Sequence, residues 1–229
     1  GGVAIGLEKL LDPDTKAGAA IGLAHTNVST DGVPQSGDVD TYALGVYGSR
    51  SYVLVDVDGS VTIAYDHSRS SRAIVVAGST AKGSSDGYGL GASLGVSHRF
   101  DLGQAWLVPR VGLDAGYDHQ DGFTETGAGA ADLSVDKTCD STARSTVGGK
   151  IYRAFRVEEG GRLTPEASIA WAHQFGDTTP QVEERFAALP GQPFSIEGAE
   201  PGRDAARGGF GLSWLPRQNL AIYARYDGT

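Results

Sequence analysis

The sequence lacks several features that mark common classes of protein. Methionine is absent and there is a single cysteine among 229 residues. We therefore expect a segment of a longer chain, with no disulfide framework and no metal site built from several cysteines. Basic residues are also few, because 19 Lys and Arg stand against 28 Asp and Glu, a formal net charge of −9. Binding to nucleic acid through its phosphates is therefore not expected.

Long apolar runs are missing too. No stretch approaches the ~18 apolar residues that a membrane-spanning helix needs. The start, Gly-Gly-Val-Ala-Ile, has no basic region of the kind that opens a signal peptide. These absences do not exclude a membrane protein, because β-barrels cross a bilayer without long apolar runs.

Strict alternation of apolar and polar residues runs along nearly the whole sequence. In the segment Val55–His67, for example, Val57, Val61 and Ile63 alternate with Asp, Ser and Thr, the period of a strand with one apolar and one polar face. Ten segments are predicted to be strands on this basis: Val3–Lys9, Ala17–Thr26, Tyr42–Arg50, Val55–His67, Tyr88–Phe100, Leu107–Tyr117, Ala143–Phe155, Leu163–Phe175, Phe210–Trp214 and Leu220–Tyr226.

The connections between these strands are predicted to alternate between short and long along the chain. The long ones are Ser29–Asp38, Ser68–Gly87, Asp121–Thr142 and Gly176–Asp204. Such a meander is typical of an all-β, up-and-down antiparallel transmembrane β-barrel with short turns at one end and long loops at the other. No linker or domain boundary interrupts it, so residues 1–229 are predicted to form one domain.

The composition of the two faces distinguishes a membrane barrel from a soluble one. A soluble barrel fills its interior with large apolar side chains and carries charges outside. Here the polar face is mostly Gly, Ala, Ser and Thr, as expected of a narrow polar lumen, and the apolar face is predicted to meet lipid. The charged residues on the polar face are the predicted lumen residues: Glu8, Asp56, Asp58, Asp66, Arg99, Arg110, Asp114, Asp118, Arg144, Lys150, Glu166, Arg207, Arg225 and Asp227. The predicted interfacial girdle of the apolar face consists of aromatic residues: Tyr42, Tyr65, Tyr88, Tyr117, Trp171 and Tyr226.

Two roles are open for the lumen charges, and both can hold for the same residues. They can form cross-strand ion pairs that keep the barrel in shape, or a polar track for a passing polypeptide. Four histidines, His25, His67, His119 and His173, lie near strand ends on the apolar face. Side chains that point outward around a barrel diverge, so these are interpreted as interfacial residues and not as a metal or catalytic cluster.

Other motifs that resemble reactive sites do not fit the predicted strands. Gly91–Gly95 fits the pattern G-x-S-x-G, but a nucleophile elbow needs a strand-to-helix turn at the serine, and Ser93 lies mid-strand. Asp56 and Asp58 lack the further oxygen ligands of a metal site. Cys139 is interpreted as a surface thiol in a long loop. No catalytic, cofactor or metal site is predicted.

Several segments, in order, resemble the autotransporter β-domain. The segment Asp-Gly-Phe-Thr-Glu-Thr-Gly-Ala at positions 121–128, followed by Leu133–Val135, resembles the hallmark of that family. The other matching segments are Gly18–Gly22, Tyr42–Gly48, Pro165–His173, Phe194–Gly198 and Arg203–Ala205. The resemblance covers essentially the whole sequence.

The resemblance implies a type V secretion translocator, a twelve-stranded barrel in the outer membrane of a diderm (Gram-negative) bacterium. Such a barrel secretes an N-terminal passenger, anchors it at the cell surface and holds a linker helix in its pore. The implied partners are outer-membrane lipid and lipopolysaccharide, the barrel assembly machinery, and the protein's own passenger and linker helix. A monomer is expected, without enzymatic activity or cofactor.

About ten of the twelve strands are assigned, so the first and last strands, the linker helix and the passenger are expected to lie outside the sequence. A porin-like channel for small solutes is the alternative function. A secreted domain and a pore-spanning helix upstream would favour the translocator.

Overall fold

The computed structural model describes residues 1–29, 34–157, 161–176, 179, 181–198, 202–217 and 220–228. A large antiparallel sheet contains ten long strands, in an order that follows the chain, and these confirm the ten predicted strands. They are β1 (Gly2–Asp12), β2 (Thr15–Ser29), β3 (Gln35–Ser51), β4 (Asp56–Ile74), β5 (Ser79–Ser97), β7 (Trp106–Gln120), β10 (Thr138–Tyr152), β12 (Arg162–Phe175), β15 (Asp204–Arg217) and β16 (Leu220–Gly228). Two short strands, β6 (Phe100–Asp101) and β11 (Phe155–Arg156), pair with β7 and β12.

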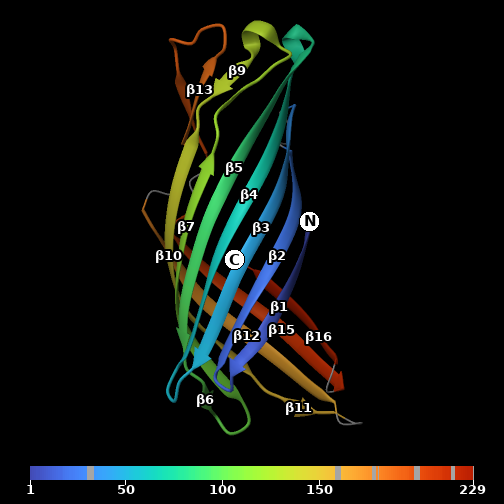
Figure 1. The fold of residues 1–229 in the computed structure, drawn as a ribbon, viewed down its shortest axis with the longest axis vertical. Helices are drawn as coiled ribbons and strands as arrows, with labels where there is room; N and C mark the ends of the chain where they lie inside the picture. Colours follow the sequence, from blue (N-terminus) through green and yellow to red (C-terminus); the bar gives the residue numbers. More distant parts are fainter. Residues whose placement is uncertain are drawn as a thin grey trace.

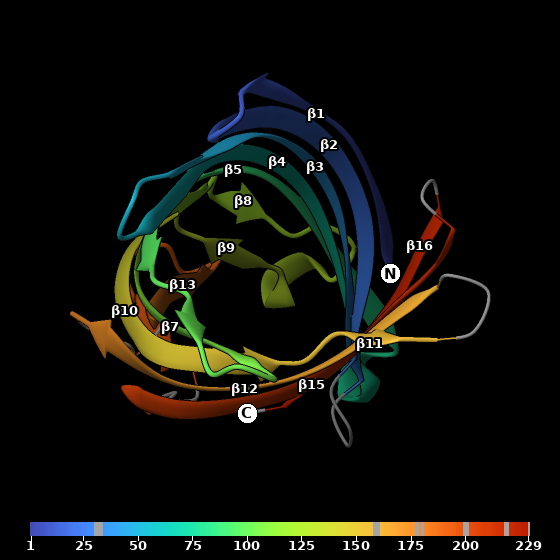
Figure 2. The ribbon, with the colours of Figure 1, turned by 90° about the horizontal axis from the view of Figure 1, so that it is seen from below.

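The large sheet is strongly curled (Figure 1). Seen along its long axis, the strands follow one another around a central space, with β1 and β16 at the two ends of the path (Figure 2). Each strand pairs with the strand before and after it in the chain, as the up-and-down prediction required. The fold is thus an all-β antiparallel sheet curled toward a barrel.

The apolar face of the sheet lies on the outside. Register places Leu44, Ile63 and Leu90 directly beside one another across β3, β4 and β5, and the Ile63 side chain is 52% exposed. Among the described residues, the only buried apolar ones are Ala81 and Ala172. Two alanines cannot form the core of a soluble barrel, so this face requires an apolar solvent. No helix in the described part of the chain is long and apolar enough to cross a membrane.

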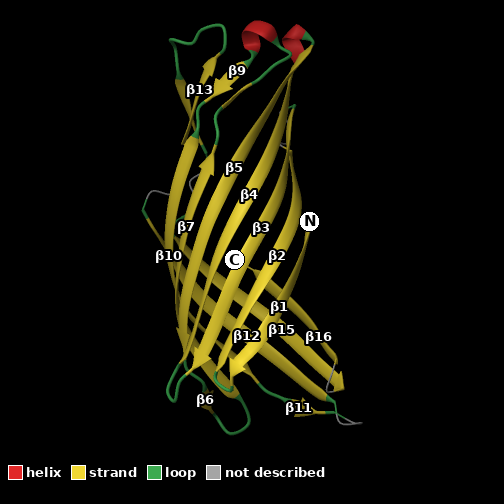
Figure 3. Ribbon diagram, in the orientation of Figure 1, coloured by secondary structure: helices red, strands yellow, loops and turns green. Residues whose placement is uncertain are grey.

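A second, smaller sheet of four strands lies at one end of the large sheet (Figure 3). It consists of β8 (Phe123–Thr124), β9 (Leu133–Val135), β13 (Gln181–Phe186) and β14 (Phe194–Glu197), in the order β14-β13-β9-β8. It lies beyond the ends of β7 and β10 in Figure 1, and in Figure 2 β8 and β9 appear within the curve of the large sheet. The small sheet therefore lies across one end of the space that the large sheet surrounds. Two 3₁₀ turns, η1 (Val75–Ala77) and η2 (Gly129–Ala131), are at the same end.

The predicted pattern of short and long connections is wrong in three places. The segment Ser68–Gly87 is not a loop, because β4 and β5 continue through it and meet at η1 and Gly78, whose φ of 61° suits glycine. The segments Asp121–Thr142 and Gly176–Asp204 contain the strands of the small sheet. Cys139 accordingly lies in β10 and not in a loop, and its side chain is exposed. Part of Ser29–Asp38 lies outside the described residues.

A buried ion pair joins the small sheet to the large one, beside an isolated β-bridge between Lys82 of β5 and Thr126. The Arg72 guanidinium of β4 contacts both carboxylate oxygens of Glu125 and donates to the carbonyl oxygen of Ala131 (3.0 Å). Glu125 is 7% exposed and also accepts from the backbone N–H of Leu133 (2.9 Å). Burial, together with the nearby Glu125, raises the pKa of Glu184 in β13. At this junction the buried Glu125 carboxylate is thus paired with the Arg72 guanidinium.

Candidate functional site: the polar inner face

The curl of the large sheet encloses a cavity of about 880 Å³. Its lining extends from β4 at one side to β16 at the other, strands that lie far apart in the sheet order. One cavity can meet both only on the concave side. Seven of the predicted lumen residues line it: Asp56, Arg99, Arg110, Lys150, Arg207, Arg225 and Asp227.

Arg110 and Asp58 form an ion pair that crosses an intervening strand. Arg110 is on β7 and Asp58 on β4, with β5 between them, and Arg110 Nη2 donates to Asp58 Oδ2 (2.6 Å). The guanidinium lies over Gly95 of β5, where a Cβ atom would overlap it. A side chain at this position would therefore displace the guanidinium from its present place.

Other predicted lumen residues pair with neighbouring strands. Arg144 lies opposite Asp114 in the register of β10 and β7, and its Nη2 is 3.2 Å from Asp114 Oδ2. The hydroxyl of Thr41 donates to Asp66. Lys16 Nζ is 3.8 Å from Glu8 Oε1, at the β1–β2 hairpin.

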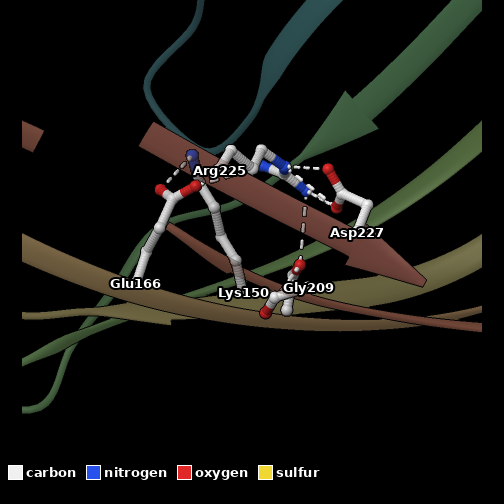
Figure 4. A network of polar contacts seen from close by, with 6 residues as sticks. Lys150, Glu166, Gly209, Arg225 and Asp227 are labelled. Atoms are coloured by element: carbon white, nitrogen blue, oxygen red, sulfur yellow. Dashed lines mark hydrogen bonds and ion pairs between the residues drawn. The ribbon is translucent and has the colours of Figure 1, made fainter. Parts of the chain in front are cut away.

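The densest group of polar contacts is centred on Glu166 and Arg225 (Figure 4). Glu166 accepts from Arg225 Nη1 (3.0 Å), and its other oxygen is 3.8 Å from Lys150 Nζ. Arg225 also donates from Nε to Asp227 (2.7 Å) and from Nη2 to the Ser168 hydroxyl (3.3 Å). The group links β10, β12 and β16 across the concave face, passing over β15.

Some of the predicted lumen residues have no ion-pair partner in the described part of the chain. Arg99 lies between β5 and β6, where its guanidinium is 4.9 Å from the centre of the Trp106 ring. Arg207 lines the cavity, and its buried Nε has no hydrogen-bond partner among these residues. Asp118 lies opposite Gly89 and Asp140 in the register, and Asp56 begins β4.

The polar face carries ion pairs but no arrangement for catalysis among the described residues. The Ser93 hydroxyl is hydrogen-bonded to that of Ser60 (2.8 Å), which offers no base. No group of three or more His, Cys, Asp or Glu residues is placed to hold a metal ion in the described ranges. Sequence reasoning missed the hydroxyl partners Thr41, Ser60 and Ser168, although their polar-face positions in the alternation could have indicated them.

The residues of the predicted girdle lie on the outer face. Tyr42, Tyr65 and Tyr88 are adjacent in one row across β3, β4 and β5, and the Tyr42 and Tyr65 rings are 6.3 Å apart. The other three residues also lie on strands. Trp171 on β12 and Tyr226 on β16 have exposed side chains. The Tyr117 ring on β7 is 6.3 Å from the Tyr88 ring.

The Gly95 contact gives a test of the cross-strand pairing. Gly91 is on the same strand and face, but a Cβ there meets nothing within 4 Å. Gly91→Ala is expected to stabilise the barrel by up to about 0.5–1 kcal/mol, since alanine costs less backbone entropy. Gly95→Ala displaces Arg110 from Asp58 and is expected to lose that gain, a difference of about 1 kcal/mol. Urea unfolding of the purified protein in detergent measures both, and equal stability of the two variants would contradict the pairing.

Comparisons with known proteins agree with this geometry. The family model described as the autotransporter beta-domain matches residues 1–227. The translocator domain of the autotransporter NalP from Neisseria meningitidis is similar in structure, with a TM-score of 0.74 and 16% identity over 100% of this chain and 74% of that one. The beta domain of the Bordetella autotransporter BrkA is similar with a TM-score of 0.69 and 15% identity, over 99% of this chain and 82% of that one. A search of curated proteins found no match.

These two likenesses show the fold, and the family match extends over essentially the whole sequence. Autotransporter beta-domains are transport barrels of the bacterial outer membrane that act in type V secretion, and a porin-like channel is not favoured. The chain belongs to the autotransporter beta-domain family.

Proposed function

We propose that this barrel moves its own N-terminal passenger through the central cavity and anchors it at the cell surface, and that the polar inner face is the surface the passing polypeptide meets. The observation that carries this proposal is the cavity lined from β4 to β16 by small residues and by charges of both signs. Small side chains leave room, and those charges that are paired, such as Arg225 with Glu166 and Asp227, bind a hydrated polypeptide only weakly. The same ion pairs hold neighbouring strands in register.

The barrel itself catalyses no reaction and needs no cofactor; Ser93, the serine of the G-x-S-x-G pattern, is hydrogen-bonded to the Ser60 hydroxyl and not to a base. It acts as a monomer in the outer membrane of a diderm bacterium. Its partners are outer-membrane lipid and lipopolysaccharide, the barrel assembly machinery, and its own passenger and linker helix, without nucleic acid.

A matched pair of substitutions on β5 tests transport through the cavity. A side chain at Gly91 projects from the inner face into open space, whereas the neighbouring Ala92 is exposed on the outer face. In the full-length protein, Gly91→Trp is expected to slow passenger display several-fold by narrowing the path. Ala92→Trp places the same ring against lipid and is expected to leave display unchanged.

Display is measured as passenger that external protease can remove from intact cells, and barrel assembly is measured separately by heat-modifiable migration. The proposal fails if Gly91→Trp assembles normally and displays its passenger at the rate of Ala92→Trp.

A further inference from the structure

A row of alternating imidazole and carboxylate side chains crosses four strands on the outer face. Register places His25 on β2 opposite Asp40 on β3, Asp40 opposite His67 on β4, and His67 opposite Asp86 on β5. We call these four residues the histidine–aspartate row. Sequence alternation placed the histidines on the apolar face, but only the register shows that carboxylates separate them.

Each imidazole in the row is held by a carboxylate through one nitrogen. His25 Nδ1 is 2.7 Å from Asp40 Oδ1, and His67 Nδ1 is 2.7 Å from Asp86 Oδ1. Among the described residues, Nε2 of neither ring has a hydrogen-bond partner. Both rings are partly exposed, with 52% and 38% of their side chains accessible. The free nitrogens are therefore available to a group outside the protein.

The histidine–aspartate row marks the boundary between the apolar and polar parts of the outer face. The next row toward the middle of the strands contains Tyr42, Tyr65 and Tyr88, with apolar residues beyond. The next row in the other direction is polar: Asn27, Asp38, Arg69 and Ser84. Because aromatic belts lie at the headgroup level of a bilayer, the histidine–aspartate row lies at the level of the lipid phosphates.

Several further groups set the charge of the row. On β4, Arg69 Nη2 donates to Asp40 Oδ2 (2.6 Å) and the Tyr65 hydroxyl donates to Asp86 (2.8 Å). Immediately before β1, the nitrogen of Gly1 donates to the carbonyl oxygen of His25 (2.6 Å). Asp38 of β3 lies opposite Arg69, and Asp121, which follows β7 and donates its backbone N–H to the carbonyl oxygen of Asp86, is 3.1 Å from Nε2 of His119.

Imidazole is the side-chain group whose charge ordinarily changes between pH 5 and pH 8. The hydrogen bonds from His25 and His67 hold the pKa of Asp40 and Asp86 below the usual range, so both carboxylates stay ionised. With Arg69 included, protonation of both rings converts a net charge of −1 into +1. The protonated rings keep Nδ1–H on the carboxylates and gain an outward Nε2–H donor.

We propose that the histidine–aspartate row binds the phosphate groups of outer-leaflet lipid headgroups, and does so more tightly when its imidazoles are protonated. Each Nε2–H donates to a phosphate oxygen, and the carboxylate fixes the direction of the ring. The inference rests on the proposed contact with outer-membrane lipopolysaccharide and names the residues that make it. A divalent cation bridging the row's carboxylates to phosphate predicts the opposite dependence on pH.

The test is binding of lipid A, a bisphosphorylated glycolipid, to the full-length protein in neutral detergent with EDTA present, at pH 5.5 and pH 7.5. Wild-type protein is expected to bind about tenfold more tightly at pH 5.5. His25→Asn with His67→Asn is expected to remove most of this difference. His98→Asn, just after the opposite end of β5, is the matched control and should behave as wild type. Asp40→Asn with Asp86→Asn should tighten binding at pH 7.5.

The inference is overturned if the double histidine variant keeps the tenfold difference, or if dephosphorylated lipid A binds with the same pH dependence. Tighter binding at pH 7.5 that requires Mg²⁺ would assign the row to cation bridging instead. Heat-modifiable migration and passenger display of the same variants separate this outcome from failure of the proposed function, because a displayed passenger with no pH-dependent lipid binding contradicts only the row.

Discussion

Ile63→Arg is expected to lower the free energy of unfolding of the membrane-embedded barrel by about 2–4 kcal/mol, the cost of arginine on the lipid face at the bilayer midplane. Thr62→Arg, one residue earlier on β4, is expected to cost much less. Thr62 lies on the inner face opposite Gly45 and Gly91 in the register, so a long cationic side chain has room and water. Equilibrium unfolding in phospholipid vesicles measures both variants at one depth in the bilayer.

The pair Val61→Arg and Ser60→Arg repeats this comparison one step along the strand. Val61 is exposed on the outer face, and the Ser60 hydroxyl is bonded to Ser93 on the inner face. The same ordering of costs is expected. Equal losses for Ile63→Arg and Thr62→Arg would contradict the assignment of the faces.

Removing one partner of the Arg72–Glu125 pair is expected to detach the small sheet. Loss of one member of a buried ion pair typically costs about 3–5 kcal/mol, because the other charge stays buried without compensation. Glu125→Ala also leaves the backbone N–H of Leu133 without its acceptor. Amide hydrogen exchange is expected to show lost protection in β8, β9 and β13, with protection kept in the large sheet.

A double variant distinguishes pairing from simple loss of packing. Arg72→Met with Glu125→Leu removes both charges and fills the space with apolar side chains, so it is expected to cost less than either single change to alanine. A double variant as unstable as the sum of the two single variants would show that the pair is not the connection. Glu183→Ala on β13, whose side chain is 52% exposed, is the control and should leave protection unchanged.

The ten long strands and their two faces could be predicted from the sequence because both depend on local alternation. A residue such as Ile63 has apolar neighbours two positions away, and register brings Leu44 and Leu90 beside it. The ends of the strands could not be predicted in the same way. Beyond His67, β4 continues through Ser68 and Ser70, where both faces are polar and alternation disappears although pairing with β5 continues.

The small sheet was missed because its strands come from two distant segments. β9 pairs with β13, so Leu133 meets Phe186 only after the large sheet has brought their connections together. No periodicity within either segment reveals such a contact.

Pairing of the lumen charges was also beyond local reasoning. Alternation assigned Asp58 and Arg110 to one face, but their contact over Gly95 requires the register of three strands. Alternation also places Thr41, Ser60 and Ser168 on the polar face, but the group that each hydroxyl contacts depends on the register.

The central claim is that the apolar face meets lipid and the polar face encloses water. Its most direct test is the accessibility of nitroxide spin labels at positions 62 and 63 of the membrane-embedded protein, in a Cys139→Ser background. The label at 63 should be relaxed by oxygen, which concentrates in lipid, and the label at 62 by a water-soluble nickel complex, with the same alternation at positions 90–96. A label at 63 that is shielded from both reagents, beside a label at 62 that is open to nickel, would contradict the account, because the apolar face would then be an interior core.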